Sequence, residues 1–533
     1  MKIVVVGGGS SGWLTAAGLI RTFPNYEICV VESKTIPTIG VGESTTTVVN
    51  LFIRDVLGID ENEFLKNVDG IYKMAVRFNN FSRKNQTYYY PFGLPVVRPD
   101  IKMLSWDIVQ YCNKHFTNED MLKLTFPAAH LFLANKIDKN KKNEFNGFDF
   151  QKHLGYHFDA NKVGAYLRDS YCIPRKVKLI QANVTDVNFM DDKVESLTLD
   201  DGSRLTGDLF VDCTGYKSIL LGQKMKPKFI DISHKLFNNR AWATPIKYKD
   251  KYKEMQPYTT ATAIENGWCW YTPIGSRIGN GYAYSDKYVT PEKALDEFKN
   301  YILNSNNYSL TKQEIDELPF FQVPMKTGFY EASMVKNVVA IGLSSGFLEP
   351  LEGTGLHFII WELFTLFRII ENGLPNQFLI DTFNLSIKKM YQTWTDGLTS
   401  VYIFSGKTDT EYWKDIFNLR TTDLNLLAQP HYGGLHESSS RILSWEGHNH
   451  TYDLFNATLR GTGFINQINE VDIISTSRGA SFNHQPYSWA SDIQKESQEI
   501  LSVFMKNKAQ WELSAQKSPH IYDFLKQNNA IKE

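Results

Sequence analysis

A glycine-rich loop near the start of the chain has the composition and spacing of a phosphate-binding turn. The apolar run Ile3 to Val6 leads into GGGSSG (residues 7–12), which has the spacing G-x-G-x-x-G, and then into a segment of helical character. A second apolar run ends at Glu32, 20 residues beyond Gly12. Glycines in this order let the backbone approach a pyrophosphate at a helix N-terminus, and the acid binds a ribose hydroxyl pair. The pattern predicts a dinucleotide site formed by Gly7, Gly9, Ser10, Ser11, Gly12 and Glu32.

Two tryptophans stand two positions apart in the segment GWCWYTP, residues 267–273. In a strand, residues i and i+2 project from the same face, so Trp268 and Trp270 are expected side by side while Cys269 and Tyr271 point the other way. Such a pair is by itself more typical of a sheet core, because aromatic side chains favour strands and interiors. The alternative is a flat aromatic wall inside a functional site.

Later segments return to glycine-rich turns, which favours FAD over NAD as the dinucleotide. These segments are IPTIGVGESTT (residues 36–46), DGSRLTGDLFVDCTGYKS (201–218) and KNVVAIGLSSGFLEPLEGTGL (336–356). Such returns are typical of FAD-binding folds of the hydroxylase type, because the long cofactor is held by segments far apart in the chain. We therefore expect further cofactor contacts from Val41, Gly42, Glu43, Ser44, Val184, Asp212, Leu343 and Leu356.

Composition excludes several classes of protein. With 57 basic and 58 acidic residues the chain has a net charge near zero and no basic block, so neither nucleic acid nor an anionic membrane is an expected partner. The apolar run before the first glycines is too short for a secretory or membrane segment. The five scattered cysteines predict neither a disulfide framework nor a zinc site, and they favour a reducing, cytoplasmic location. We expect no metal site, because His153, His157 and His234 lack matching carboxylate spacing.

Seven segments together resemble the flavin-dependent halogenases, in particular the tryptophan-halogenase-like family. They span roughly the first two thirds of the chain in the family's order: GGGSSGWLTAAGL (7–19), IGVGES (39–44), YKMAVRF (72–78), GYHFDANKVGAYLR (155–168), DLFVDCTGY (208–216), GWCWYTPIGSRIGNGYAYS (267–285) and IGLSSGFLEPLEGTGLHFI (341–359). The family's most distinctive signature is W-x-W-x-I-P, which reads W-C-W-Y-T-P here with Thr272 in place of isoleucine. The resemblance implies that Trp268, Trp270 and Pro273 form a barrier that only halide or hypohalous acid can pass.

The resemblance also implies two catalytic residues. Lys73 matches the family's catalytic lysine, whose ammonium group can donate a hydrogen bond to hypohalous acid or, if burial lowers its pKa, react with it to form a haloamine. Glu352 matches the active-site glutamate, which can orient the hypohalous acid, stabilise the cationic ring intermediate and help to remove the ring proton. Glu349, three residues earlier, is the rival, and we assign it a structural role.

A helix is expected to begin near Leu356, and its free N–H groups predict an anion site. By resemblance, Thr354 and Gly355 would bind chloride or bromide there. A plain helix cap is the alternative, and the two roles are compatible. Gly353 departs from the serine that many family members carry after the glutamate, so a hydroxyl contact at this position is not expected.

The implied reaction needs FAD as FADH2, O2 and a halide ion. A separate NAD(P)H-dependent flavin reductase would supply the FADH2, because the chain shows only one convincing dinucleotide fingerprint. The substrate would be a small electron-rich aromatic molecule such as an indole, phenol or pyrrole. Tryptophan itself is not assigned, because Tyr90 stands where many tryptophan-specific members carry histidine and because PHYGGLHESSSRILSW (430–445) does not reproduce their amino-acid-binding residues. The sequence leaves self-association into a homo-oligomer open.

These residues require an α/β fold, mixed α+β in character, with an FAD-binding Rossmann-type domain of the hydroxylase/halogenase kind and a mostly helical C-terminal cap. We expect a body over residues 1–360, in which segments of about 1–80, 150–230 and 330–360 bind the nucleotide and inserts of about 80–150 and 230–330 face the substrate. Residues 361–533 would form the cap, since apolar spacing lengthens to a helical period from Leu356 onward.

Two other functions share some of these features. A single-component FAD-dependent aromatic monooxygenase would share the fingerprint, but it would need its own reactivity with NADH and an open path from substrate to flavin. A catalytically idle FAD-binding protein would not depend on Lys73 or Glu352.

Overall fold

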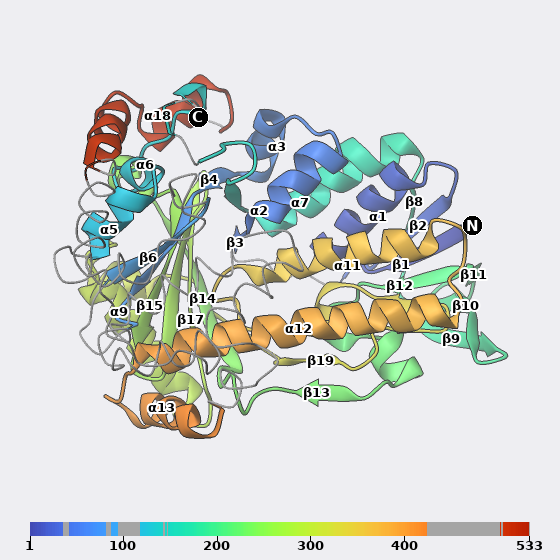
Figure 1. Ribbon diagram of the computed structural model, residues 1–533. Coiled ribbons are helices and arrows are strands. Elements are labelled where there is room, and N and C mark those ends of the chain that lie inside the picture. Colours follow the sequence, from blue (N-terminus) through green and yellow to red (C-terminus); the bar gives the residue numbers. More distant parts are fainter. Residues whose placement is uncertain are drawn as a thin grey trace, which may run out of the picture.

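A mainly parallel sheet of six strands forms one end of the molecule (Figure 1). The computed structural model describes residues 1–35, 42–81, 87–93, 118–141, 144–145, 148–423, 502 and 505–531. Within the sheet the strand order is β20 (Met334–Val335), β21 (Val338–Ala340), β12 (Leu209–Asp212), β1 (Lys2–Val6), β2 (Glu27–Glu32) and β8 (Lys178–Gln181). All neighbours are parallel except β20 and β21. The central strand β1 is the buried apolar run that the sequence analysis identified, and the Rossmann-type fold class is confirmed.

A second, seven-stranded sheet forms the other end. Its order is β18 (Phe321–Pro324), β14 (Arg240–Lys247), β17 (Arg277–Tyr284), β16 (Gly267–Pro273), β15 (Tyr258–Ile264), β5 (Ala75–Asn79) and β6 (Thr87–Pro91). Only the β15–β5 pair is parallel. The tryptophan segment is therefore the fourth, central strand, and every residue of β16 is buried.

Three small sheets connect or flank these layers. The first joins β3 (Glu43–Ser44), β7 (Gly155–Phe158) and β4 (Ile71–Lys73), and β7 is its middle strand. The second contains β9 (Val184–Met190), β10 (Lys193–Leu199) and β11 (Arg204–Thr206), and the third β13 (Phe229–Asp231), β19 (Gly328–Tyr330) and β22 (Gly346–Phe347). In the first of these sheets, β7 pairs on one side with β3, which lies in the second glycine-rich segment, and on the other with β4, which ends at Lys73.

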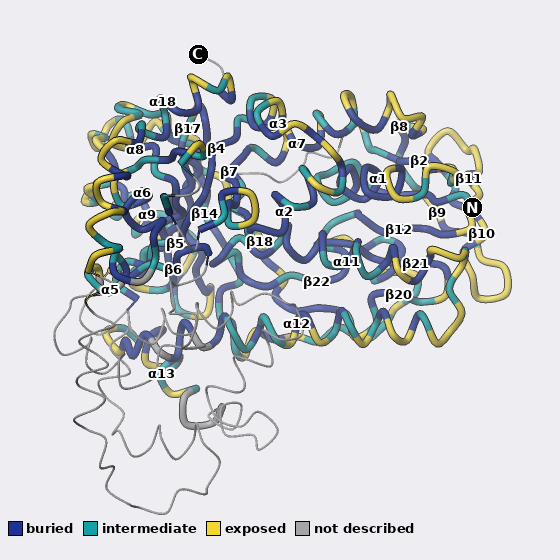
Figure 2. Tube along the Cα trace, turned by 45° about the horizontal axis from the view of Figure 1, so that its top comes forward, coloured by how far each residue is buried: buried dark blue, intermediate teal, exposed yellow. Residues whose placement is uncertain are grey.

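Two long helices run along the length of the molecule (Figure 1): α11 (Thr354–Ile370), from the middle toward the parallel sheet, and α12 (Gln377–Ser405), alongside both sheets. In the described part of the chain, the other helices of eight or more residues are α1 (Ser10–Thr22), α3 (Glu61–Val68), α5 (Asn118–Thr125), α9 (Pro291–Asn304) and α13 (Glu411–Asp423), and residues 505–516 are also helical. The shorter ones are α2 (Thr47–Leu51), α6 (Ala129–Phe132), α7 (Ala160–Tyr166), α8 (Lys251–Glu254), α10 (Lys312–Asp316) and α18 (Ile521–Gln527). Figure 2 shows α12 with a buried inner side and a more exposed outer side.

The expected boundary between residues 360 and 361 falls inside α11. The physical reason is packing: α11 lies against α1, and Phe367 on α11 meets Phe23 just after α1 edge to face. The helix therefore continues the body beyond residue 360. Residues 424–501 of the predicted cap, which include 430–445, lie outside the described residues, so the helical character of this part stays a prediction.

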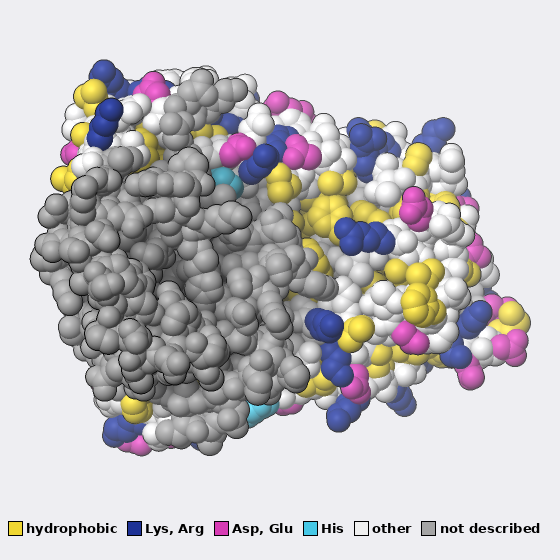
Figure 3. All heavy atoms as spheres, viewed as in Figure 1, with side chains coloured by type: hydrophobic (Ala, Val, Ile, Leu, Met, Phe, Trp, Pro, Cys, Tyr) yellow, Lys and Arg dark blue, Asp and Glu magenta, His cyan; other side chains and the backbone are white. Residues whose placement is uncertain are grey.

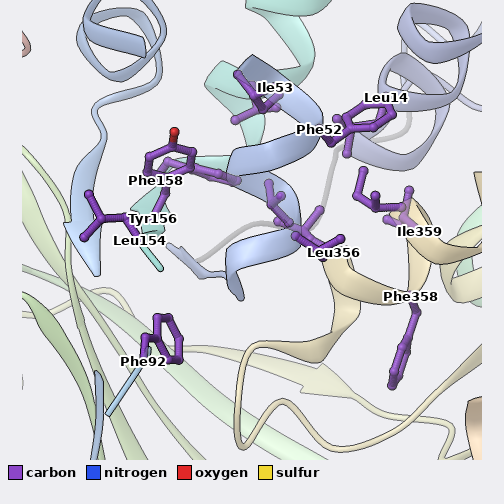
Figure 4. Close-up of a cluster of buried hydrophobic side chains, with 14 of the residues drawn as sticks. Leu14, Phe52, Ile53, Phe92, Leu154, Tyr156, Phe158, Leu356, Phe358 and Ile359 are labelled. Carbon is purple, nitrogen blue, oxygen red and sulfur yellow. The ribbon is translucent and has the colours of Figure 1, made fainter. Parts of the chain in front are cut away.

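The largest hydrophobic core joins both ends of the molecule. Figure 4 shows Leu356 and Ile359 of α11 near Phe52 and Leu14, while Phe92 approaches from the end of β6. Because one core contains residues of both α1 and the strand of the tryptophans, the two sheets are packed together through a shared interior. On the described part of the face in Figure 3, basic and acidic side chains are interspersed, in keeping with the near-zero net charge. Within the described residues, no helix is long and apolar enough to cross a bilayer.

Candidate active site

A cavity of about 520 Å³ lies where the parallel sheet, the start of α11 and the seven-stranded sheet meet. Its wall contains most of the residues predicted to bind a cofactor. These are Gly7, Gly9, Ser10, Ser11, Glu32, Gly42, Glu43, Ser44, Val184, Leu343 and Leu356. Segments separated by more than 300 residues thus contribute to one site, as a long dinucleotide requires. Val41 lies outside the described residues.

The first turn of α1 forms one end of this cavity. Gly7 has a φ of 116°, and a Cβ there would lie 2.3 Å from the carbonyl oxygen of Cys213, so only glycine fits. Gly12 does not line the cavity: a Cβ at this position would lie 1.8 Å from the Gly7 oxygen, so its role is to let the loop fold onto the helix. Gly9 caps α1 without a side-chain hydrogen bond, which leaves the helix N-terminus free for an anionic group.

Glu32 supplies a partly buried carboxylate at the end of β2. Its Oε2 is buried and has no hydrogen-bond partner among the described residues, while Oε1 lies 3.6 Å from Arg168 Nη1. Burial raises the pKa of Glu32, although Arg168 opposes this effect. An unsatisfied carboxylate oxygen in a cavity wall fits a ligand that brings hydroxyl donors, as a ribose does.

Asp212 departs from its expected role as a cofactor contact, since it does not line the cavity. Its Oδ1 accepts hydrogen bonds from the N–H and hydroxyl of Thr214, and its Oδ2 accepts from the N–H groups of Leu220 and Leu221. The carboxylate is therefore saturated by its own turn and holds that turn in place. The cavity is lined instead by residues 213–217, which follow Asp212 in the same segment (201–218) and which were not predicted individually as cofactor contacts.

The two tryptophans of β16 share one face, as predicted, with ring centroids 6.0 Å apart. Small residues on the neighbouring strands make room for them: Trp270 lies opposite Ala261 and Gly281, and Trp268 opposite Ala263 and Ala283. A Cβ at Gly281 would lie 2.0 Å from the Trp270 indole. The small residues opposite Trp268 and Trp270 therefore leave space for both indole rings on this face of the sheet.

This strand contributes to the cavity wall. Trp270 and Thr272 line it, whereas Trp268 does not, so the Trp268 indole lies behind that of Trp270. Pro273 does not line the cavity either, and its carbonyl oxygen lies 3.0 Å from His157 Nδ1. Of the three residues predicted as a barrier, only Trp270 therefore contacts the cavity directly.

Lys73 and Glu352 are both buried, and neither lines the cavity. Lys73 Nζ has no hydrogen-bond partner among the described residues and lies 4.9 Å from the centroid of the Phe92 ring. Burial lowers the pKa of Lys73 to about 7, against the opposing charge of Glu352. Burial raises the pKa of Glu352 to about 8, against the opposing charge of Lys73. Two groups that titrate near neutral pH and influence each other are suited to proton transfer.

Because the pKa of Glu352 is raised in the folded state, wild-type stability should fall relative to E352Q as pH rises. The folded protein binds a proton that the unfolded chain has released above its ordinary pKa of about 4.3. The free energy of unfolding of wild type should therefore decrease relative to E352Q between pH 5 and about 8. Urea denaturation of the cofactor-free proteins at several pH values measures this difference. A constant difference across that range would show that Glu352 is ionised throughout.

Glu349 has a different role from Glu352, in agreement with its expected structural assignment. It is fully buried and accepts hydrogen bonds from Tyr402 Oη, from Asn238 Nδ2 (3.0 Å) and from Trp268 Nε1 (3.3 Å). Its pKa is raised by burial, which these donors partly oppose. Glu349 thus holds the Trp268 indole by its only polar atom, a link that nothing in the local sequence pattern indicated.

The start of α11 lies at the cofactor cavity and directly follows Glu352. Gly353 is its N-cap, with φ 71° and no side-chain hydrogen bond, and Gly353 and Gly355 line the cavity while the side chain of Thr354 is buried away from it. The N–H groups of this first turn are therefore available to an anion on the cavity side.

Replacing Gly353 by serine should destabilise the cofactor-free protein by about 2 kcal/mol or more, because its left-handed backbone alone disfavours other residues by about 1–2 kcal/mol. In addition, a Cβ would lie 2.2 Å from the Ser44 oxygen. Thermal and urea unfolding measure the loss. The matched control is Gly355→Ala, whose Cβ would meet no atom within 4 Å and which should leave stability unchanged or slightly higher. Equal stability of G353S and G355A would refute this account of the turn.

This chain is similar to known proteins both in its sequence and in its fold. The family model described as "Tryptophan halogenase" matches residues 2–428. Tryptophan 6-halogenase ThaL of Streptomyces albogriseolus is 32% identical over 438 residues, which cover 79% of this chain and 80% of ThaL.

Two solved structures show the same fold over nearly the whole chain. VirX1 in its apo form has a TM-score of 0.83 at 28% identity and covers 99% of this chain and 98% of its own. Tryptophan 6-halogenase SttH from Streptomyces toxytricini has a TM-score of 0.79 at 26% identity, covering 98% of this chain and 99% of its own.

Proposed function

Because the chain belongs to the tryptophan halogenase family and is a flavin-dependent halogenase, we propose that it binds FAD in the 520 Å³ cavity and halogenates a small aromatic molecule beside Lys73 and Glu352. The observation that carries this proposal is that Trp270 lines the cavity, while Lys73 and Glu352 both lie outside its wall. Cofactor and substrate would thus occupy separate compartments.

The cavity wall fits FAD in three respects. The free N-terminus of α1 suits a pyrophosphate, the unsatisfied Oε2 of Glu32 suits ribose hydroxyls, and the apolar and aromatic residues toward β16 suit a ring system. When bound in its reduced form, FAD supplies, together with O2 and halide, the hypohalous acid used in halogenation. The first-turn N–H groups at Thr354 and Gly355 would hold the halide.

On the other side of the wall, Lys73 would act on the hypohalous acid and Glu352 on the substrate ring. With a pKa of about 7, Lys73 exists in both protonation states near neutral pH, so it can donate a hydrogen bond as an ammonium or attack halogen as an amine. The halogen is transferred to a ring carbon, the hydroxyl group leaves as water after gaining a proton, and the ring proton passes to the Glu352 carboxylate.

The proposed reaction determines which protein partner, cellular location and substrate are expected. A separate NAD(P)H-dependent reductase would supply FADH2, and location in the cytoplasm would provide reduced nicotinamide. The four cysteines in the described part of the chain are free and buried, which agrees with a reducing compartment. For the substrate we retain an electron-rich indole, phenol or pyrrole. The names of the relatives place free tryptophan among the compounds to be tested.

The monooxygenase alternative is not favoured by the comparisons. It would also require the substrate to react beside the flavin, whereas Lys73 and Glu352 both lie outside the cavity wall.

The proposal is tested by incubating the protein with FAD, a flavin reductase, NADH and either chloride or bromide, together with a panel of indoles, phenols and pyrroles that includes tryptophan. Mass spectrometry should detect halogenated product that depends on both the reductase and the halide. NADH without reductase should leave bound FAD oxidised. Hydroxylated product without halogen, formed from NADH alone, would instead establish the monooxygenase.

A further inference from the structure

A chain of hydrogen bonds leads from the cofactor cavity into the protein interior. Ser44 and Thr259 both line the cavity, and their hydroxyl oxygens are 2.7 Å apart. Thr259 Oγ1 is 2.8 Å from Nε2 of His157, and His157 Nδ1 is 3.0 Å from the carbonyl oxygen of Pro273. The chain therefore runs from the cavity to the last residue of the tryptophan strand.

The carbonyl group at one end fixes the direction of every hydrogen bond in the chain. A carbonyl oxygen can only accept, so Nδ1 of His157 must carry a proton. In the neutral imidazole Nε2 is then an acceptor, so Thr259 donates to it. The Thr259 oxygen in turn accepts from the Ser44 hydroxyl. Ser44 is left with acceptor capacity on the cavity side.

The neutral form of His157 is the one that its surroundings favour. His157 is fully buried in β7, and burial lowers its pKa well below the ordinary value. The charge of Lys73, on the adjacent strand β4, lowers this pKa further, while the bond to Pro273 opposes both effects. Among the described residues, Lys73 is the one ionisable group whose charge acts on His157.

We propose that Ser44, Thr259 and His157 form a proton relay that accepts a proton from a group in the cofactor cavity and passes it to the buried imidazole. A donor in the cavity gives its proton to Ser44, the Ser44 proton moves to Thr259, and the Thr259 proton moves to Nε2. The two hydroxyls are regenerated and His157 becomes an imidazolium that still donates to Pro273. Return of the proton by the same path restores the starting state.

This relay links the chemistry on the two sides of the wall, and it rests on the proposed location of FAD in the cavity. An imidazolium beside a charged Lys73 is unfavourable, so the relay accepts a proton more readily when Lys73 is neutral. Proton uptake from the cavity would therefore depend on the protonation state of the lysine on the substrate side. The sequence spacing alone could not show this, because Ser44 and Thr259 are 215 positions apart, His157 and Thr259 are 102 positions apart, and the three residues lie in three different strands.

The test compares Thr259→Val with Thr260→Val. Both threonines are buried and adjacent on β15, but the Thr260 hydroxyl has no hydrogen-bond partner among the described residues and does not line the cavity. The first readout uses the cofactor-free protein: ¹⁵N NMR of labelled histidine should show His157 protonated at Nδ1, with an Nε2 signal that shifts in T259V and not in T260V.

The second readout is the rate of hypohalous acid formation from FADH2, O2 and halide in H2O and D2O. T259V should slow this rate on the order of 10- to 100-fold and change its solvent isotope effect, whereas T260V should match wild type and T259S should recover most of the rate. If T259V does not fold, Ser44→Ala interrupts the cavity end of the same relay, and the same loss is expected.

Two results would overturn the relay: a T259V or S44A protein with wild-type rate and isotope effect, or a His157 protonated at Nε2. The proposed function fails separately, if the wild-type protein binds no FAD or makes no halogenated product.

Discussion

Replacing Lys73 by methionine is expected to reduce halogenated product on the order of 10³-fold, the scale typical for removal of a positioned acid or base. Methionine has a similar length and is apolar, so it fills the same buried space. The amine it removes has no hydrogen-bond partner among the described residues. The free energy of unfolding should therefore stay the same or increase, because a buried ionisable group without a partner is destabilising. Product is measured by mass spectrometry and stability by urea denaturation.

The location of Lys73 outside the cavity makes this prediction specific. FAD affinity should remain within about 2-fold of wild type, since Lys73 does not line the cavity. Lys73→Arg provides a matched comparison, because arginine keeps the hydrogen-bond donors but cannot lose its proton. Activity retained in K73R would support hydrogen bonding to hypohalous acid, and its loss would support the haloamine route. A K73M protein with near wild-type halogenation would remove Lys73 from the mechanism.

Glu352→Gln should lower halogenation by about 100-fold while leaving hypohalous acid formation intact. The side chain keeps its size, but it can neither carry the negative charge that stabilises a cationic ring nor accept the ring proton. Hypohalous acid is measured with a soluble trapping reagent in the absence of aromatic substrate, and product is measured separately.

Glu352→Asp should retain more activity than E352Q, because the carboxylate persists in a shifted position. Loss of the trapped hypohalous acid in E352Q would instead place Glu352 in the oxidant-forming step. If both steps were unaffected, the idle FAD-binding protein would become the better description.

The glycine-rich end of the cavity was predictable because its signal is local. A buried strand, a tight loop, a helix start and an acid follow one another within 32 residues, and each has its own steric reason. The pairing of Trp268 and Trp270 was predictable for a similar reason, because alternation along one strand fixes which side chains share a face.

The departures come from contacts between distant segments. The Asp212 carboxylate accepts its hydrogen bonds from its own turn and does not reach the cavity. Pro273 does not line the cavity either, and its carbonyl oxygen contacts His157. The bond from Trp268 to Glu349 spans 81 positions, and that from Ser44 to Thr259 spans 215. No local spacing encodes such pairs, so they required the fold.

The most direct measurement is a crystal structure of the protein with FAD and an aromatic substrate bound together. The account predicts FAD along the glycine-rich loop with its ring system toward Trp270, and the substrate ring beside Lys73 and Glu352 on the far side of both indoles. A substrate ring stacked on the isoalloxazine, with the indoles of Trp268 and Trp270 not between them, would contradict it.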